Sequence, residues 1–313
     1  MKKFIIAVVV LCVVLAGAVF IVPLVTSQEV YTWEEAKGHI APGQFVQAGT
    51  DATHYIVRGE GPHLILIHGF LYNTIMWKEV MEPLAKGFRV HAIDLLGWGY
   101  SSRLKEGNYS YQLYADQLLK FMDALGITQT SIVGQSMGGG TAILFATQHP
   151  ERVRKIVLVD AAGLPNPLPL AGRIFALPYL GEFLLSLPRH AVLRKNIQDL
   201  FFYDPTRVTN EYMEGVERPF QIKGSGRTVL NILRTLDFGS LSPEIHKLGE
   251  MGKPILLLWG REDKAVPLPL GEEMHKILKG SEMKIIEKAG HIPHEEHPEE
   301  AARLMIDFLS KQP

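Results

Sequence analysis

The sequence contains, at residues 130–140, the stretch T-S-I-V-G-Q-S-M-G-G-G, in which an apolar β-branched run leads into a serine between glycines. The apolar run predicts a buried strand, and a helix is expected to open at Gly139. A strand that turns sharply into a helix strains its corner residue, and only small residues fit two positions to either side. An ordinary glycine-rich turn is one alternative; a dinucleotide-binding turn is disfavoured because Ser136 stands where G-x-G-x-x-G requires glycine. The pattern G-x-S-x-G therefore predicts that Ser136 is an exposed nucleophile.

A general base and an acid are expected downstream of the serine, each just after a strand. Residues 254–260 predict a short buried strand, and Asp263 follows it. Residues 283–286 predict another, and His291 follows that one. Because the carboxyl ends of parallel strands meet at one edge of a sheet, these side chains are expected near Ser136. The predicted roles are nucleophile for Ser136, base for His291 and orienting acid for Asp263.

A fourth element of the predicted site lies upstream of the serine. Residues 64–67 form an apolar run that predicts a buried strand, and it ends in His68-Gly69-Phe70. The backbone N–H groups of Phe70 and Met137 are expected to form an oxyanion hole, which stabilises the negative charge that develops on the substrate oxygen. A structural role is expected for His68, because the base is already predicted downstream.

Composition excludes several classes of partner. The 313 residues include 32 basic and 33 acidic side chains, so no nucleic-acid footprint is visible. The single cysteine, Cys12, excludes an intramolecular disulfide. One cluster could suggest a metal site, but its spacing fits neither H-E-x-x-H nor a Cys/His finger. No metal and no organic cofactor are therefore predicted; the cluster comprises His291, His294, Glu295 and His297.

The N-terminus predicts a membrane anchor. Lys2 and Lys3 precede an uninterrupted apolar run over residues 4–25. A helix of about 22 residues is roughly 33 Å long, enough to cross a hydrocarbon core. The positive-inside rule then places the catalytic domain on the extracytoplasmic side. The alternative is a signal peptide cleaved at a small-residue site, residues 16–18, which would give a secreted or periplasmic enzyme. Cleavage there would leave the apolar residues 19–25 at the N-terminus of the mature chain.

From about residue 53 to the C-terminus, the chain resembles the α/β-hydrolase superfamily. The matching motifs are H-G-F at 68–70, D-L-L-G-W-G-Y-S at 94–101, G-Q-S-M-G-G at 134–139, V-L-V-D-A-A-G at 157–163, G-R-E-D-K-A-V-P at 260–267 and A-G-H at 289–291. The order Ser136, Asp263, His291 is also the order of that superfamily. Within it, the chain is most similar to capped esterases, lipases and C–C bond hydrolases. Haloalkane dehalogenases and epoxide hydrolases carry an aspartate at the position of Ser136.

The resemblance implies an α/β-hydrolase fold: a mostly parallel central sheet with helices on both faces and an inserted helical cap. The cap is expected where the chain turns proline-rich after residue 163 and loses its strand pattern, and it would roof Ser136. The predicted segments are an anchor or signal at 1–25, a juxtamembrane linker at 26–41, the first part of the core at 42–163, the cap at 164–241 and the second part of the core at 242–313.

The acid has one alternative. Asp160 ends an earlier predicted strand, and some hydrolases of this fold place their acid there. Asp263 is preferred because its G-x-x-D context matches the superfamily better.

The predicted function is that of a serine hydrolase cleaving small hydrophobic esters, lipid-like or monoacylglycerol-like, through an acyl-serine intermediate. The main alternative is a C–C bond hydrolase of the meta-cleavage type, which part of the cap resembles. Two departures count against it: the chain has H-G-F-L-Y-N in place of a glycine-rich oxyanion loop, and Val216 stands where that family has a cap arginine, with Arg218 two residues on. A non-catalytic binding protein is disfavoured, because such proteins usually lose a member of the triad and all three are present.

Overall fold

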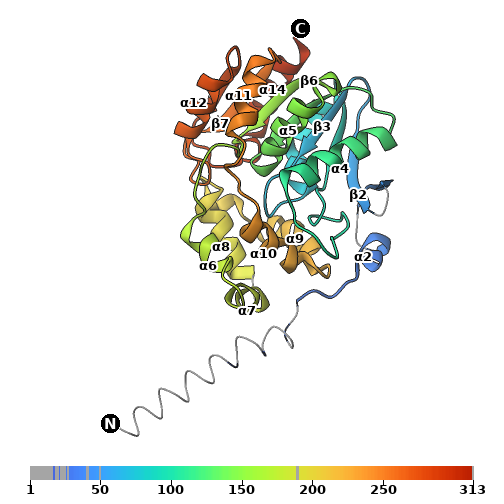
Figure 1. Cartoon of the computed structure of the whole chain (residues 1–313), viewed down its shortest axis with the longest axis vertical. Coiled ribbons are helices and arrows are strands. Elements are labelled where there is room, and N and C mark those ends of the chain that lie inside the picture. Colours follow the sequence, from blue (N-terminus) through green and yellow to red (C-terminus); the bar gives the residue numbers. More distant parts are fainter. Residues whose placement is uncertain are drawn as a thin grey trace.

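An eight-stranded sheet forms the centre of the protein (Figure 1). The computed structural model describes residues 28–39, 42–48, 51–187 and 190–311, together with Gly17, Ile21 and Thr26. The strand order is β1-β2-β4-β3-β5-β6-β7-β8, with β3 to β8 mutually parallel and with β1 and β2 antiparallel to their neighbours. The strands are β1 (Gln44–Ala48), β2 (Asp51–Arg58), β3 (His63–Ile67), β4 (Arg89–Ile93), β5 (Thr130–Gln135), β6 (Val153–Val159), β7 (Ile255–Gly260) and β8 (Glu282–Ile286).

Helices cover both faces of the sheet, so successive residues of its central strands are buried rather than alternately buried and exposed. All six residues of β5 and of β7 are buried. Helix α3 packs with α14 in one layer, and α4, α5, α11 and α12 form the other. The predicted fold class is thus confirmed. These helices are α3 (Lys78–Ala85), α4 (Tyr111–Ala124), α5 (Met137–Gln148), α11 (Ser242–Glu250), α12 (Leu268–Ile277) and α14 (Pro298–Ser310).

A helical cap is inserted between β6 and β7, and Figure 1 shows it as a separate layer at one end of the sheet. Its described α-helices are α6 (Leu170–Phe175), α7 (Leu180–Ser186), α8 (His190–Leu200), α9 (Asn210–Glu217) and α10 (Ser225–Thr235). The remaining short elements are α2 (Trp33–His39), α13 (Pro293–Glu296), η1 (Thr74–Trp77), η2 (Pro150–Arg152), η3 (Pro205–Arg207) and η4 (Arg218–Gln221).

The predicted linker, residues 26–41, is hydrogen-bonded to the cap over the part that the structure describes. The N–H groups of Val30 and Tyr31 donate to the carbonyl of Gln221. The Glu29 carboxylate accepts hydrogen bonds from the N–H groups of Gly224 (2.7 Å) and Gly226 (2.6 Å), at the start of α10. A carboxylate is favourable at a helix N-terminus, where the backbone N–H groups lack partners within the helix. This contact ties the chain before α2 to a helix of the cap.

The predicted membrane anchor is corrected by the structure. A spanning helix needs about 20 consecutive apolar residues. Across the part of the chain that the structure describes, no helix combines the length and the apolar content that crossing a bilayer requires. Of residues 4–25, only Gly17 and Ile21 belong to that part, and the rest of the predicted anchor lies outside the described residues. The single-pass anchor and the extracytoplasmic placement that rested on it are therefore withdrawn.

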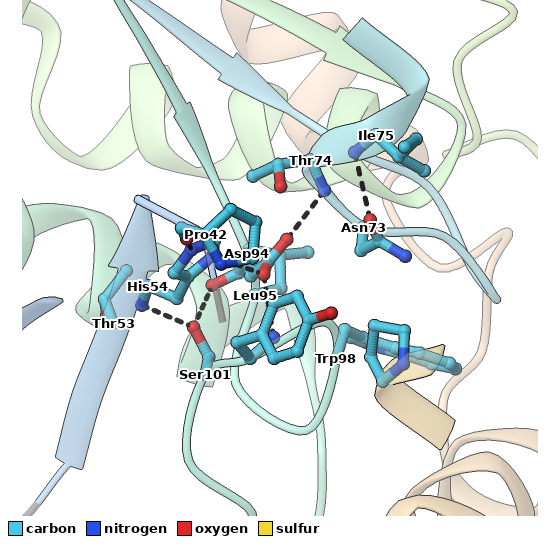
Figure 2. Close-up of polar contacts among 12 residues, drawn as sticks. Pro42, Thr53, His54, Asn73, Thr74, Ile75, Asp94, Leu95, Trp98 and Ser101 are labelled. Atoms are coloured by element: carbon cyan, nitrogen blue, oxygen red, sulfur yellow. Dashed lines mark hydrogen bonds and ion pairs between the residues drawn. The ribbon is translucent and has the colours of Figure 1, made fainter. Parts of the chain in front are cut away.

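A buried carboxylate organises the loops beside the sheet edge. Figure 2 shows the Asp94 side chain between His54 of β2 and Thr74 at the start of η1. Its Oδ1 accepts a hydrogen bond from the Thr74 N–H (2.7 Å), and its Oδ2 accepts one from the Tyr100 N–H (2.8 Å) and one from His54 Nδ1 (2.7 Å). A Cβ on Gly99 would lie 1.9 Å from Asp94 Oδ2, so only glycine fits there. The motif D-L-L-G-W-G-Y-S is thus a loop wrapped around one carboxylate.

The His54 side chain is fully buried and is bonded at both ring nitrogens, through Nδ1 to Asp94 and through Nε2 to the carbonyl of Pro42. Burial alone would lower its pKa, but the charge of Asp94 and these two bonds together raise the pKa of His54 above its ordinary 6.5. Burial likewise opposes ionisation of Asp94, yet the charge and hydrogen bond of His54 hold the pKa of that carboxyl below its usual value. Both ring nitrogens of His54 face an oxygen acceptor, so both donate, and the pair is a buried ion pair.

We predict that His54→Asn lowers the free energy of unfolding by about 3 kcal/mol, because it leaves a buried charge without its partner. A raised histidine pKa contributes stability that is complete below pH 6.5 and is lost as the pH rises through the raised value. The deficit of the variant should therefore be largest below pH 6.5 and shrink at alkaline pH. Urea unfolding of wild type and variant over a pH series measures this.

The matched control is His246→Asn. The His246 side chain is exposed on α11, and its Nδ1 is hydrogen-bonded to the backbone carbonyl of Ser242 rather than to a buried carboxylate. Its effect should stay within about 0.5 kcal/mol at every pH. A deficit for His54→Asn that is independent of pH, or that grows with pH, would contradict the ion pair.

Candidate active site

Ser136 lies at a strained corner between β5 and α5. Its φ is +51° and its ψ is −118°, a conformation that a residue with a side chain rarely adopts. A Cβ on Gly134 would lie 2.4 Å from the Gly138 carbonyl oxygen, and a Cβ on Gly138 would lie 2.2 Å from the Ile67 carbonyl oxygen. The Ser136 N–H donates to the Val159 carbonyl (3.0 Å). The glycines of G-x-S-x-G are therefore required by close backbone packing around the corner.

His291 and Asp263 are brought together as the sequence predicts. His291 Nδ1 lies 2.8 Å from Asp263 Oδ2, and both side chains are buried. The other oxygen, Asp263 Oδ1, accepts hydrogen bonds from the N–H groups of Ala265 (2.7 Å) and Val266 (2.9 Å). The carboxylate is thus held by its own loop with one oxygen facing the imidazole. Nδ1 must then carry the proton, and Nε2 is left as the acceptor.

Asp160, the alternative acid, lies beside this pair but is bonded differently. Its Oδ1 accepts a hydrogen bond from the Gly260 N–H (2.9 Å), and its Oδ2 has no partner among the described residues. Burial and the neighbouring charge of Asp263 raise the pKa of Asp160 well above its ordinary value. These two effects favour the neutral form of Asp160, and Asp263 is the carboxyl group that faces His291.

Asp160, Asp263 and His291 each offer one ligand atom within 4.8 Å of the others, close enough for a cation. The raised pKa of Asp160 favours its neutral form, which is a poor ligand, and His291 Nδ1 is already hydrogen-bonded to Asp263. In the other cluster noted from the sequence, His294 stacks on Trp77 with ring centroids 4.5 Å apart, and burial lowers its pKa to about 3. In the first cluster Asp263 and His291 are therefore hydrogen-bonded to each other, and in the second the His294 ring packs against an indole.

The loop expected to form the oxyanion hole is pressed against the serine. A Cβ on Gly69 would lie 3.0 Å from Ser136 Cβ and 2.1 Å from Gln135 Oε1. The Phe70 ring packs edge-on against Trp98 and Phe238 at centroid distances of 5.2 and 5.7 Å. The next residue is also strained, because Leu71 has a φ of +68°. The backbone of 69–71 thus runs directly beside the corner.

His68 has a structural role in this loop. Its Nε2 accepts a hydrogen bond from the Leu95 N–H (3.0 Å), so its Nδ1 carries the proton and donates to the Gly69 carbonyl (2.7 Å). Burial lowers the pKa of His68, which keeps the ring neutral. The residue is buried away from the substrate cavity and fastens the loop to the end of β4.

Ser136 and His291 open into one cavity of about 220 Å³ beneath the cap. Its described lining contains no Lys, Arg, Asp or Glu side chain. The polar side chains in its wall are Tyr72, Gln135, Asn166 and Asn196, besides Ser136 and His291. The apolar wall includes Phe175, Leu184, Leu193, Leu200, Val229 and Leu233 from the cap, and Phe70 and Val266 from the core.

The two cap positions that could have supplied a cation do not reach this cavity. Val216 is fully buried in the core cluster. Arg218 pairs with Glu214 at 2.8 Å, with both side chains about half exposed, and it borders separate grooves. Among the residues that the structure describes, the cavity wall therefore carries no Lys, Arg, Asp or Glu side chain.

Comparisons with known proteins agree with this geometry. Residues 62–298 match the family model described as alpha/beta hydrolase fold. The chain is 30% identical over 273 residues to a 2-hydroxy-6-oxononadienedioate/2-hydroxy-6-oxononatrienedioate hydrolase of Paraburkholderia xenovorans, covering 82% of this chain and 90% of that one. The solved structure of a meta-cleavage product hydrolase from Pseudomonas fluorescens is 27% identical with a TM-score of 0.72, covering 85% of this chain and 97% of that one.

The solved structure of a membrane phospholipase A, described as a bacterial virulence factor, is also similar to this chain. It is 28% identical with a TM-score of 0.71, and the match covers 99% of this chain and 98% of that one. The family model spans well over half of the chain, from β3 to the start of α14, and so includes both halves of the core. The chain therefore belongs to the α/β-hydrolase family, and it is a hydrolase.

Proposed function

We propose that Ser136, His291 and Asp263 form a catalytic triad. Support comes from the 2.8 Å contact between His291 Nδ1 and Asp263 Oδ2, and from the shared cavity of Ser136 and His291. Ser136 is the nucleophile and His291 the base, and Asp263 orients the imidazole and stabilises its charged form. The N–H groups of Phe70 and Met137 form the oxyanion hole, and one such donor is worth about 3 kcal/mol in the transition state.

The reaction proceeds in two balanced halves. In the first, His291 Nε2 takes the proton of Ser136 Oγ while Oγ bonds to the acyl carbon, and the collapsing oxyanion expels the leaving group, which takes that proton. In the second, a water molecule gives a proton to Nε2 and its oxygen bonds to the acyl carbon. The bond to Oγ breaks, Ser136 recovers its proton, and the acid product leaves.

The proposed substrate is an uncharged ester with an apolar acyl chain. The observation that carries this proposal is that the described wall of the Ser136 cavity is apolar and free of ionised side chains. Burying a carboxylate without a cationic partner costs several kcal/mol, whereas each buried methylene gains about 0.8 kcal/mol. The similarity to a membrane phospholipase A, an enzyme of ester bonds, is consistent with this class.

A second candidate is cleavage of a C–C bond, and the comparisons favour it over the ester. Similar proteins are named as hydrolases of 2-hydroxy-6-oxo dienoates or dienedioates, which carry one or two carboxylates. Such a substrate requires cationic or strong donor groups in the cavity, and Val216 and Arg218 supply none. The same triad could serve this reaction, so the cavity wall is the point at which the two candidates differ.

Substrate profiling separates the two candidates. For p-nitrophenyl esters from acetyl to octanoyl, we predict that kcat/KM rises by about fourfold per methylene until the cavity is full, the equivalent of about 0.8 kcal/mol each. A meta-cleavage dienoate should be turned over poorly. A flat or falling ester series together with efficient dienoate cleavage would establish the second candidate instead.

We predict that Ser136→Ala and His291→Ala each lower kcat by at least about 10⁴-fold without a comparable loss of stability, because triad members act as a unit. Steady-state kinetics on the best ester and thermal unfolding measure the two effects. A fluorophosphonate probe should label wild type and fail to label Ser136→Ala. Either variant keeping more than about a tenth of wild-type kcat would refute the assignment.

The two aspartates should respond in opposite ways to amide substitution. Asp263→Asn removes the charge that faces His291 and should lower kcat by about 10⁴-fold. Asp160→Asn replaces a neutral acid by a neutral amide that still accepts the Gly260 N–H, so its kcat should change by less than about tenfold. The reverse result, with Asp160→Asn inactive and Asp263→Asn active, would exchange their roles.

A further inference from the structure

The loop that carries His291 is fastened to the cap through its backbone. The His291 N–H donates to the carbonyl of Phe201, in the turn that follows α8, at 2.8 Å. Gly290 packs so closely on that turn that a Cβ there would lie 2.5 Å from the Phe201 carbonyl oxygen and 2.9 Å from the Tyr203 nitrogen. On the other side, the His291 carbonyl accepts a hydrogen bond from Gln135 Nε2 (2.9 Å). The position of the imidazole therefore depends on a backbone that is held on one side by the cap turn and on the other by Gln135, the residue before Ser136.

One buried carboxylate joins the same two segments. Glu296, at the end of α13, is 1% exposed. Its Oε1 accepts hydrogen bonds from the N–H groups of Tyr203 and Asp204 in the cap turn, both at 2.9 Å. Its Oε2 accepts one from the N–H of Gly290, the residue before His291, at 2.6 Å. Hydrogen bonds to a carboxylate are stronger than neutral ones, and here three of them converge from two segments.

The cap turn also contacts the substrate cavity. Phe201 lines the cavity, and its ring lies 5.3 Å from the His291 ring and 5.7 Å from the Tyr72 ring, centroid to centroid. An acyl chain in the cavity therefore packs against the residue whose carbonyl holds the His291 N–H. The same cap residue, Phe201, thus holds the His291 backbone through its carbonyl and forms part of the cavity wall through its ring.

We propose that Glu296 is a positioning residue, which sets the place of His291 relative to Ser136 by fastening the cap turn 201–204 to Gly290. The inference rests on the proposed function, in which His291 is the base. Through these hydrogen bonds, the position of the cap on the core determines where the His291 imidazole lies relative to Ser136 Oγ. A displaced cap would therefore move the imidazole away from the serine. A misplacement of about 1 Å between reacting groups costs about 100-fold in rate.

The neighbouring glutamate provides a matched control. The Glu295 side chain interacts with Tyr212, and burial raises the pKa of Glu295 well above its ordinary value, which favours the neutral carboxyl. Replacing Glu295 with glutamine keeps the shape of the side chain, and Glu295 accepts no hydrogen bond from Gly290 or from the N–H groups of the cap turn, which Glu296 holds. Replacing Glu296 with glutamine keeps shape but puts an NH₂ group where an acceptor is needed, against Gly290 or against the two N–H groups of the cap turn.

The test compares Glu296→Gln with Glu295→Gln in the full chain, using p-nitrophenyl octanoate. Glu296→Gln should lower kcat by about 100-fold and slow fluorophosphonate labelling by a similar factor, with KM changed by less than about threefold. Glu295→Gln should stay within about threefold of wild type in all three. A merely structural role would lower the unfolding temperature and leave kcat of the folded protein unchanged, and that result overturns the proposal.

A second variant covers the case in which Glu296→Gln does not fold. Gly290→Ala leaves the carboxylate in place and pushes the cap turn away with one methyl group. The same loss of kcat is expected, and a wild-type kcat in folded Gly290→Ala contradicts the proposal. The proposed function fails separately: activity that survives Ser136→Ala and His291→Ala removes the triad, whereas inactive triad variants beside a fully active Glu296→Gln remove only this inference.

Discussion

The strained backbone of Ser136 is the constraint on which the rest of the site depends. A φ of +51° at the end of a buried strand turns the chain so tightly that α5 starts one residue later. The turn is tolerated because the flanking glycines allow backbone from β3 and α5 to pack where a Cβ would otherwise lie. The same packing brings the loop at Gly69 against the serine. The proposed nucleophile and oxyanion loop are thus positioned by one local geometry, and the proposed base and acid follow two neighbouring strands, β8 and β7.

Much of the fold and the site could be predicted because their signals are local. A G-x-S-x-G pattern after an apolar run reports a backbone requirement, and apolar runs report strands that are buried on both faces. The meeting of His291 with Asp263 followed from a general property of parallel sheets, whose carboxyl ends share one edge. The structural role of His68 was expected because the base was already predicted at His291, and both ring nitrogens of His68 are bonded to backbone groups. None of these inferences needed information on which distant residues touch.

Other features could not be predicted because they depend on contacts between distant segments. His54 is unremarkable in β2, and only the folded loop around Asp94 makes it half of a buried ion pair. Glu296 lies in an acidic stretch of sequence, which is typical of a solvent-exposed surface. In the folded chain its carboxylate is buried and accepts hydrogen bonds from two N–H groups of the cap turn and from that of Gly290. The sequence favoured Asp263 over Asp160 by its motif, but the contact that distinguishes the two, between Asp263 Oδ2 and His291 Nδ1, joins two different loops. The predicted anchor rested on an apolar run and the two lysines before it, and the described helices did not support it.

If Ser136 is the nucleophile, as proposed, it is acylated during turnover. Rapid mixing with p-nitrophenyl octanoate, acid quench and peptide mass mapping test this directly. We expect an octanoyl group to appear on the peptide that contains Ser136 before steady state and to disappear when the substrate is exhausted. Product release without any acylated peptide, or an acyl group that maps to another residue, would contradict it.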